Sequence, residues 1–423
     1  MTSINSFAAF DSRLREFMRV SQERLPEMFG TSWSHKPTPN PSREGNCRAA
    51  DELMLPSREV SGVGRLMEAE FNQLALALFT LQFAHVESYR RFCEARRITP
   101  DKINCWSDIP PVPAAAFKEF DLSSLPLAER TFVFHSSGTT AQRTSRHFHN
   151  AESLAIYEAS LLPWFKAHLL PDGKAIDFVT LTPSPALAPH SSLARMCDTV
   201  RRDLGSRDSL FTGKINGPAA WMLDIDSTLD ALRKSTDTER PVALLGTAFS
   251  FVHLLDHLSP RQLEFALPTG SRVMETGGYK GRSRNLPRAE LHALLTRCLS
   301  IPPSYIVCEY GMCELSSQAY DWKVRKASTL RSKAAAEDGE SGTQNEARLF
   351  RFPPWARVRV VSPETGAAVT EGETGLIQVY DLANVRSVMA IQTEDLAARR
   401  GDGFELLGRA ELAEPRGCSL MSL

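Results

Sequence analysis

Residues 131–147 read TFVFHSSGTTAQRTSRH, an apolar run of Phe132, Val133 and Phe134 followed by hydroxyl side chains around a glycine. The run predicts a strand and the hydroxyl-rich segment predicts a loop. Glycine lets the backbone approach a ligand closely, while backbone N–H groups and hydroxyls can donate hydrogen bonds to phosphate. The loop lacks the lysine of a GxxxxGK[ST] motif, so it is not a Walker A loop. We therefore expect a phosphate-binding loop that serves another nucleotide chemistry.

Around this loop, short apolar runs alternate with stretches of helical spacing. The apolar runs lie at 131–135, 176–182, 241–246, 271–275 and 304–308, and the helical stretches lie at 151–169, 226–234, 249–258 and 287–299. This alternation predicts an α/β fold with a largely parallel sheet. Two earlier stretches, 8–25 and 62–97, also have helical spacing.

Changes in composition divide the chain into five segments. We expect an N-terminal helix plus a flexible, proline-containing insert (34–46) in residues 1–61, an α/β core in 62–322, a flexible charged loop in 323–346, a small β-rich subdomain in 347–411 and a mobile tail with Cys418 in 412–423.

Composition excludes several classes of function. The 423 residues carry a net charge of −1, and no long basic block is present, so no nucleic-acid partner is expected. No apolar run approaches the ~18 residues of a membrane span, and no secretory signal is evident. The eight cysteines form no CxxC pair, so a zinc site has little support. Reduced thiols and a cytoplasmic location are the simplest expectation.

Four further segments carry residues suited to nucleotide chemistry. They are METGGYKGRSR at 274–284, CEYGMCELSSQ at 308–318, TED at 393–395 and LGR at 407–409. A tyrosine before a glycine can lie against a base, and a carboxylate can hold a divalent cation that phosphates carry. A carboxylate can also accept hydrogen bonds from ribose hydroxyls, and arginine can pair with phosphate.

Each of these segments also has an ordinary structural interpretation. The first could be a strand-to-helix turn with solvated cations, and the second a helix start with an acidic first turn. The third could be a solvated acidic residue at a strand end, and the fourth a surface arginine.

The order of the motifs resembles the acyl-adenylate-forming superfamily of acyl-CoA synthetases, luciferases and peptide-synthetase adenylation domains. The closer resemblance is to acyl-protein synthetases of the LuxE type, the fatty-acid-activating component of a bacterial luminescence fatty acid reductase. It covers most of residues 62–423. The segments behind it are PPVPAAAFKEF (110–120), FHSSGTTAQRTSRH (134–147), LTPSPALAPHSSLARM (181–196), ETGGYKGRSR (275–284), EYGMCELSSQ (309–318) and DLANVRSVMAIQTEDL (381–396).

The resemblance implies the N-terminal adenylating domain of that superfamily, with parallel-sheet α/β subdomains and a small β-rich part. ATP, with Mg²⁺, and a fatty or other carboxylic acid would form acyl-AMP and pyrophosphate. Tyr310 would stack on adenine, Glu314 would serve the metal, Asp395 would bind ribose and Arg409 would hold the nucleotide near a hinge. The implied nucleotide-binding set is Ser136, Ser137, Gly138, Thr139, Thr140, Gly277, Gly278, Tyr310, Gly311, Glu314, Asp395 and Arg409.

The chain departs from the superfamily pattern in two places. Cys313 stands where the usual YGxTE box has threonine, which removes a hydroxyl from the ligand-binding segment. The sequence ends soon after Arg409, so no C-terminal lid domain is expected, and the lysine that assists adenylation is expected to be absent with it. Lys280 and Arg282 are the nearby cations that could compensate.

For the second half-reaction the resemblance implies a cysteine near the C-terminus that carries the acyl group, and Cys418 matches it. A thiol beside Arg416 could attack the mixed anhydride and deliver a thioester to an acyl-reductase-like protein partner. Two alternatives stay open. The acceptor could be coenzyme A or a carrier-protein thiol, or the chain could be a non-catalytic subunit that binds acyl-adenylate.

Overall fold

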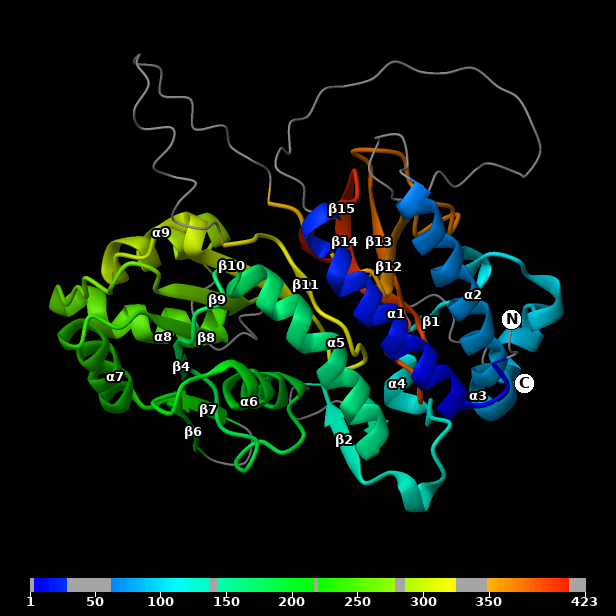
Figure 1. The fold of residues 1–423 in the computed structure, drawn as a ribbon, viewed down its shortest axis with the longest axis horizontal. Helices are drawn as coiled ribbons and strands as arrows, with labels where there is room; N and C mark the ends of the chain where they lie inside the picture. The colour runs from blue at the N-terminus through cyan, green and yellow to red at the C-terminus, as the bar shows by residue number, and fades with distance from the viewer. Residues whose placement is uncertain are drawn as a thin grey trace, which may run out of the picture. The chain divides into compact units, whose positions relative to one another are not determined.

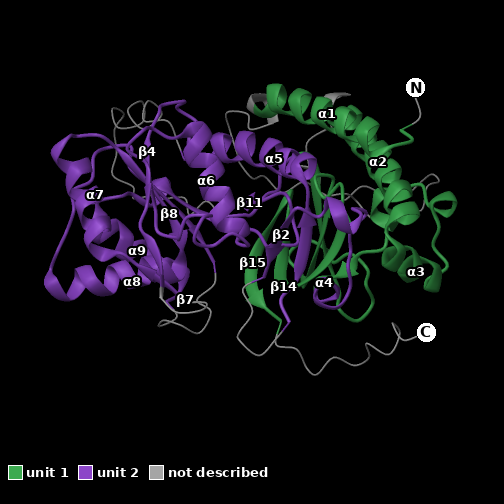
Figure 2. Cartoon of the chain, turned by 90° about the horizontal axis from the view of Figure 1, so that it is seen from below, with its two compact units in different colours: residues 1–114, 354–423 green, residues 115–353 purple. Residues whose placement is uncertain are grey.

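The computed structural model describes residues 4–28, 62–136, 143–216, 220–277, 286–324 and 348–410 (Figure 1). The chain divides into two compact units, residues 1–114 with 354–423 and residues 115–353 (Figure 2). Each unit contains its own sheet. Among the helices in these ranges, none combines the length and apolar character needed to cross a membrane.

In its described residues the first unit contains three α-helices and a five-stranded sheet. Strand β13 pairs antiparallel with β12 and β14, β15 pairs antiparallel with β14, and β1 pairs parallel with β14. The elements are α1 (Phe7–Met28), α2 (Gly62–His85), α3 (Glu87–Ala95), β1 (Val112–Pro113), β12 (Ala356–Val361), β13 (Thr374–Asp381), β14 (Ala390–Arg400) and β15 (Gly403–Arg409).

The stretch 62–97, which has helical spacing, forms two helices because the helical conformation is interrupted at Val86. This residue has φ −109° and ψ 93°, an extended conformation that separates α2 from α3. Its side chain is 1% exposed and belongs to the core, so apolar spacing continues through a residue that is not helical. Hydrophobic periodicity reports which residues are buried, and a short break leaves it intact.

Helix α2 belongs with the C-terminal strands rather than with the α/β core, in contrast to the predicted division at residue 62. The amide of Gln82, fully buried, donates to the carbonyl of Asn384 at 2.8 Å, and its oxygen accepts from the N–H of Met389 at 3.0 Å. Glu68 forms an ion pair with Arg357 of β12 at 3.0 Å. These contacts join segments that lie about 300 positions apart in sequence, a separation that local composition does not register.

The second unit is built on a six-stranded sheet in the order β11-β10-β9-β8-β4-β5. All its pairings are parallel except that of β11 with β10. Its strands are β4 (Asp177–Thr180), β5 (Leu210–Phe211), β8 (Val242–Thr247), β9 (Arg272–Thr276), β10 (Ile306–Tyr310) and β11 (Ala319–Tyr320), and two hairpins add β2 (Phe132–His135) with β3 (Arg146–His149) and β6 (Gly213–Asn216) with β7 (Ala220–Leu223). The predicted, largely parallel α/β sheet is confirmed.

The helices of this unit are α4 (Ala116–Glu119), α5 (Ala151–Leu169), α6 (Ser192–Leu204), α7 (Ile225–Asp237), α8 (Ala248–Leu258) and α9 (Arg288–Leu299). Short 3₁₀ turns in the two units span Pro100–Lys102, Trp106–Asp108, Leu127–Glu129, Ser259–Arg261 and Pro303–Tyr305.

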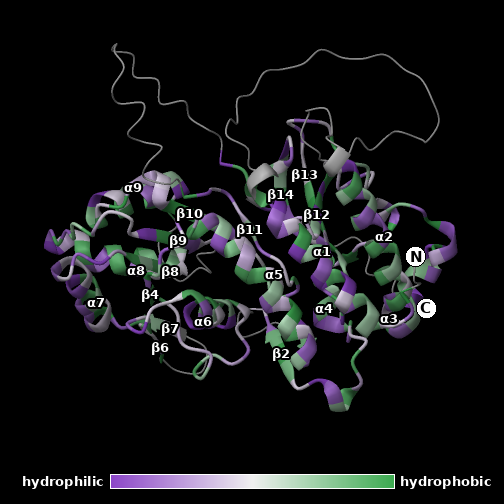
Figure 3. Cartoon of the chain, viewed as in Figure 1, coloured by the Kyte–Doolittle hydropathy of each residue, from purple (hydrophilic) through white to green (hydrophobic). Residues whose placement is uncertain are grey.

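Every residue of β8, β9 and β10 is buried, as expected for parallel strands covered on both faces. Two neighbouring residues of β10 both interact with Glu275 of β9. Glu309 interacts electrostatically with Glu275, and also with Tyr157 of α5 and Cys197 of α6. Cys308 likewise interacts with Glu275, whose carboxylate contacts His292 of α9 at 3.3 Å. The surrounding helices carry both hydrophilic and hydrophobic residues in Figure 3, as helices with one buried side do.

We predict that Gln82→Met strongly destabilises the first unit. The apolar side chain leaves the Asn384 carbonyl and the Met389 N–H buried without their partner, at about 1–3 kcal/mol for each group. Urea unfolding followed by circular dichroism measures the change. Arg65→Met, at an exposed position of the same helix, is the control and should change stability by less than about 0.5 kcal/mol. Equal effects of the two substitutions would contradict the assigned role of Gln82.

Candidate functional site

Strands β9 and β10 end side by side and bring two of the predicted motifs together. Their parallel register pairs Cys308 with Glu275 and Glu309 with Thr276. The residues that follow this last pair are Gly277 and Tyr310. Parallel sheets bind ligands at the carboxyl ends of their strands, so residues 274–277 and the 308–318 segment meet where a ligand is expected.

The segment after β10 is a loop that returns as the antiparallel strand β11. The alternative that it begins a helix is therefore wrong.

Gly311 follows Tyr310 directly, and a Cβ atom at this position would overlap Oε1 of Glu309. The Tyr310 ring packs edge-on against Phe350 and Phe352, with centroid separations of 6.0 and 6.2 Å. A side chain at position 311 would therefore have to displace the Glu309 carboxyl group.

Glu314 and Cys313 lie in this loop and are both buried. The Cys313 thiol donates to the Glu314 carboxylate, with 3.2 Å between Sγ and Oε2. The thiol that replaces the usual threonine hydroxyl therefore bonds to the neighbouring carboxylate. This contact orients the side chain that the sequence assigns to the metal.

Glu314 suits Mg²⁺ in a nucleotide complex, since magnesium prefers oxygen ligands and commonly takes one or two carboxylates plus substrate phosphates. Within the residues that the structure describes, no three His, Cys, Asp or Glu side chains gather in a way that could hold a metal ion. A single buried carboxylate fits a cation that arrives with phosphates better than a dedicated metal cage.

The predicted phosphate loop extends from the β2–β3 hairpin. Ser136 is its first residue and lies opposite Ser145, whose N–H donates to the Ser136 hydroxyl at 2.9 Å. Nδ1 of His135 lies 2.9 Å from the Thr144 hydroxyl. Two polar contacts thus join the strands directly below the loop. Residues 137–142, with the candidates Ser137, Gly138, Thr139 and Thr140, lie outside the described residues.

The 181–196 segment is held against the same hairpin. His190 accepts from the N–H of His135 through its carbonyl at 2.9 Å, and its ring Nδ1 lies 3.1 Å from the carbonyl of Val133. Ser191 then caps α6 by accepting from the N–H of Ala194. This segment, quoted for the resemblance without an assigned role, connects the sheet to the loop-bearing hairpin.

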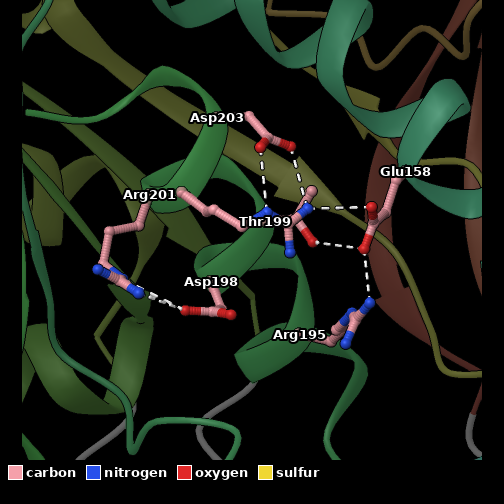
Figure 4. Close-up of polar contacts among 7 residues, drawn as sticks. Glu158, Arg195, Asp198, Thr199, Arg201 and Asp203 are labelled. Carbon is pink, nitrogen blue, oxygen red and sulfur yellow. Dashed lines mark hydrogen bonds and ion pairs between the residues drawn. The ribbon is translucent and has the colours of Figure 1, made fainter. Parts of the chain in front are cut away.

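Helix α6 is fixed to α5 by a charged cluster around Glu158 (Figure 4). One Glu158 oxygen accepts from Arg195 at 2.6 Å, and the other accepts from Arg202 at 3.0 Å. Arg202 also pairs with Asp203 at 3.0 Å. Because these side chains are partly exposed, each pair contributes little on its own, but together they fix the direction of α6 relative to α5.

Asp395 and Arg409 belong to the first unit, where they lie opposite each other on two neighbouring antiparallel strands. Asp395 lies inside β14, which continues to Arg400, so its predicted place at a strand end is wrong. Arg409 of β15 is its partner in the antiparallel register. The guanidinium forms an ion pair with Glu394 at 3.1 Å and is largely exposed. Two candidates from separate sequence motifs, TED and LGR, thus occupy facing positions of one hairpin.

Several predicted residues lie outside the described part of the chain. They are Ser137, Gly138, Thr139, Thr140, Gly278, Lys280, Arg282 and Cys418. Their assigned roles stay predictions.

Two buried residues in this region were not assigned by the sequence. Burial, reinforced by the charge of Glu275, raises the pKa of Glu309 to about 8. Burial likewise lowers the pKa of His147 to about 4, so this imidazole is neutral near pH 7. Glu309 stands in an otherwise apolar run, YIVCEY, which was the one available signal. His147 lay within a quoted motif, but no local pattern pointed to its contact.

Comparison with known proteins places the chain in a family. A family model described as acyl-protein synthetase, LuxE, matches residues 45–422. The chain belongs to this family. It is therefore an ATP-dependent acid ligase of the LuxE type.

One relative is the long-chain-fatty-acid–luciferin-component ligase of Aliivibrio fischeri. It is 20% identical over 371 residues, which cover 82% of this chain and 86% of the relative. The fold resembles that of 2-hydroxyisobutyryl-CoA ligase. An open form with 2-HIB-AMP and CoA gives a TM-score of 0.54 at 14% identity, covering 81% of this chain and 70% of the ligase. A postadenylation form gives 0.54 and 14%, with 81% and 68% covered. The expected adenylate-forming fold is confirmed.

We predict that Glu309→Gln stabilises this LuxE-family protein increasingly as pH rises. A carboxyl with a folded pKa of about 8 holds a proton that the unfolded chain has already released, so the wild type loses stability between about pH 5 and pH 8. Glutamine does not titrate and so removes this loss. The free energy of unfolding of the variant should rise relative to wild type by at most about 1.4 kcal/mol per pH unit. Urea unfolding at pH 5.5, 6.5, 7.5 and 8 measures the difference.

Glu364→Gln, at an exposed turn, is the control for removing one carboxylate. If the free energies of unfolding of Glu309→Gln and wild type differ by the same amount from pH 5.5 to 8, Glu309 is ionised in the folded protein and the prediction is wrong.

Proposed function

We propose that this protein converts a carboxylic acid, expected to be a fatty acid, and ATP into acyl-AMP and pyrophosphate, and then transfers the acyl group to the thiol of Cys418. The observation that carries the proposal is the convergence of the Gly277 and Tyr310–Glu314 motifs at the carboxyl ends of β9 and β10, in a chain of the LuxE family. Sequence order alone left these motifs with ordinary structural alternatives.

The first step needs no nucleophile from the protein. An oxygen of the substrate carboxylate attacks the α-phosphorus, and the bond to the pyrophosphate oxygen breaks. The protein positions the two reactants and neutralises charge on the phosphates. The hydroxyls and N–H groups of residues 136–140 would bind phosphate, and Tyr310 would contact the base. When bound, Mg²⁺ would neutralise phosphate charge beside Glu314.

Other roles follow the family pattern. Gly277, Gly278 and Gly311 would allow the backbone close to the nucleotide. Asp395 would accept from the ribose hydroxyls and Arg409 would contact the nucleotide. Lys280 and Arg282, in the segment after β9, are proposed to supply positive charge to the phosphates.

In the second step the Cys418 thiolate attacks the acyl carbonyl to form the thioester C–S bond, the bond between the carbonyl carbon and the AMP oxygen breaks, and AMP leaves with that electron pair. The thiol proton passes to solvent. The resulting thioester would then be delivered to a reductase-like partner that makes an aldehyde. A thioester keeps the carbonyl activated, which suits such a transfer.

We predict acid-dependent exchange of labelled pyrophosphate into ATP, tested over fatty and aromatic acids. Glu314→Gln keeps an oxygen that can accept from the Cys313 thiol but removes the charge, and should lower exchange at least about tenfold and raise the Mg²⁺ requirement. Glu364→Gln serves as the control. No exchange by the wild type with any acid would favour the non-catalytic, adenylate-binding alternative.

We further predict that Cys418 carries the acyl group. Incubation with the preferred acid and Mg-ATP should add one acyl mass to the intact protein, and hydroxylamine should remove it. Cys418→Ser should lose this adduct while keeping pyrophosphate exchange. Cys105→Ser, at a half-buried thiol, is the matched control and should keep both. A Cys418→Ser protein that forms acyl-CoA or an acyl carrier thioester at the normal rate would establish the alternative acceptor.

A further inference from the structure

A buried histidine connects the loop-bearing hairpin to the segment that contains Glu314. His147 lies in β3, four residues after the described chain resumes at Arg143, and is 2% exposed. Its Nδ1 lies 2.9 Å from the carbonyl oxygen of Cys313. The contact joins residues 166 positions apart in sequence. It belongs to no strand pairing and no turn, so the side chain alone makes this connection.

The partner atom fixes the direction of the hydrogen bond. A carbonyl oxygen can only accept, so Nδ1 of His147 carries the hydrogen and donates it. A phenylalanine at position 147 could fill the space of the imidazole ring, but it could not donate this hydrogen bond. Phe134, at the paired position of β2, is such a side chain without a donor. The nearby His149 instead contacts a residue close in sequence, Ser153 of α5, at 3.2 Å. Only the His147 bond of this pair reaches the 311–318 segment in the contacts described.

The far side of that segment is held as well. The Ser317 hydroxyl lies 2.9 Å from the hydroxyl of Ser160 on α5. Helix α5 begins directly after β3 at Asn150, whose side chain accepts from the N–H of Ser153. The hairpin and α5 are therefore continuous, and both hold the 311–318 segment. From Cys313 the thiol continues the connection to the Glu314 carboxylate.

We propose that His147 is a positioning residue, which holds Cys313 and Glu314 in register with the strand that follows the 136–140 loop. The carboxylate assigned to the metal would then meet the nucleotide in a single geometry. The consequence for catalysis rests on the proposed function. The positional claim, that His147 fixes Cys313, stands on the contacts alone.

Two substitutions separate hydrogen bonding from packing. His147→Asn places an amide N–H at the same number of bonds from Cβ as Nδ1, so the bond to Cys313 can be kept. His147→Phe fills the space without a donor. His168→Phe is the matched control, because this buried histidine makes the same kind of bond, from Nδ1 to the carbonyl of Trp164 at 2.9 Å. Urea unfolding confirms that each variant is folded under the assay conditions.

The first measurement needs no activity. Cys313 is 6% exposed, and its alkylation by iodoacetamide is followed by peptide mass spectrometry. His147→Phe should speed alkylation of Cys313 by about tenfold or more, while His147→Asn and His168→Phe should stay near wild type. A wild-type rate in folded His147→Phe, or an equal acceleration in His168→Phe, would overturn the proposal.

The second measurement uses pyrophosphate exchange. His147→Phe should raise KM for Mg-ATP about tenfold, leave KM for the acid unchanged, and be largely rescued by His147→Asn. Equal effects on both KM values, or no rescue, would overturn the catalytic part. If the wild type shows no exchange, the proposed function fails and the alkylation result still decides whether His147 positions Cys313.

Discussion

The parallel register of β9 with β10 is the constraint on which the candidate site depends. Pairing Glu309 with Thr276 makes the two strands end within one residue of each other, so that Gly277 and Tyr310 follow the same pair at the edge of the sheet. Parallel neighbours require a crossover, which α9 supplies, and the crossover leaves the carboxyl edge open for ligand-binding loops. The backbone at this edge is buried and hydrogen-bonded, so the side chains that follow it stand on a rigid base.

Polar groups are concentrated next to this edge in a region from which water is excluded. Glu309, His147 and the Ser160–Ser317 pair are all buried within the second unit. Burial raises the pKa of Glu309 and lowers the pKa of His147, so both groups are uncharged near neutral pH. Neutral polar side chains can make directional bonds without the large cost of a buried charge. This chemistry specifies the position of the 311–318 loop more closely than apolar packing would.

Several elements were predictable because their signals are local. Helix α5 spans the predicted 151–169, since Asn150 and Ser153 form a capping box at its start. The central strands were predictable because parallel strands buried on both faces are continuous apolar runs. The errors fall where tertiary contacts override local pattern. Val86 is extended within an apolar stripe, and Asp395 lies mid-strand because β15 extends the pairing of β14 beyond the TED motif.

The sequence by itself determined the alternation of strands and helices, the hydroxyl loop after an apolar run, and the motif order that matches the LuxE family. These features depend on residues close together in the chain. Tertiary structure alone decided that α2 joins the C-terminal strands, that Asp395 faces Arg409, and that His147 reaches Cys313. Such contacts form between distant segments only after the sheets are assembled. Periodicity reports that a side chain is buried, but it carries no information about the atom that the side chain meets.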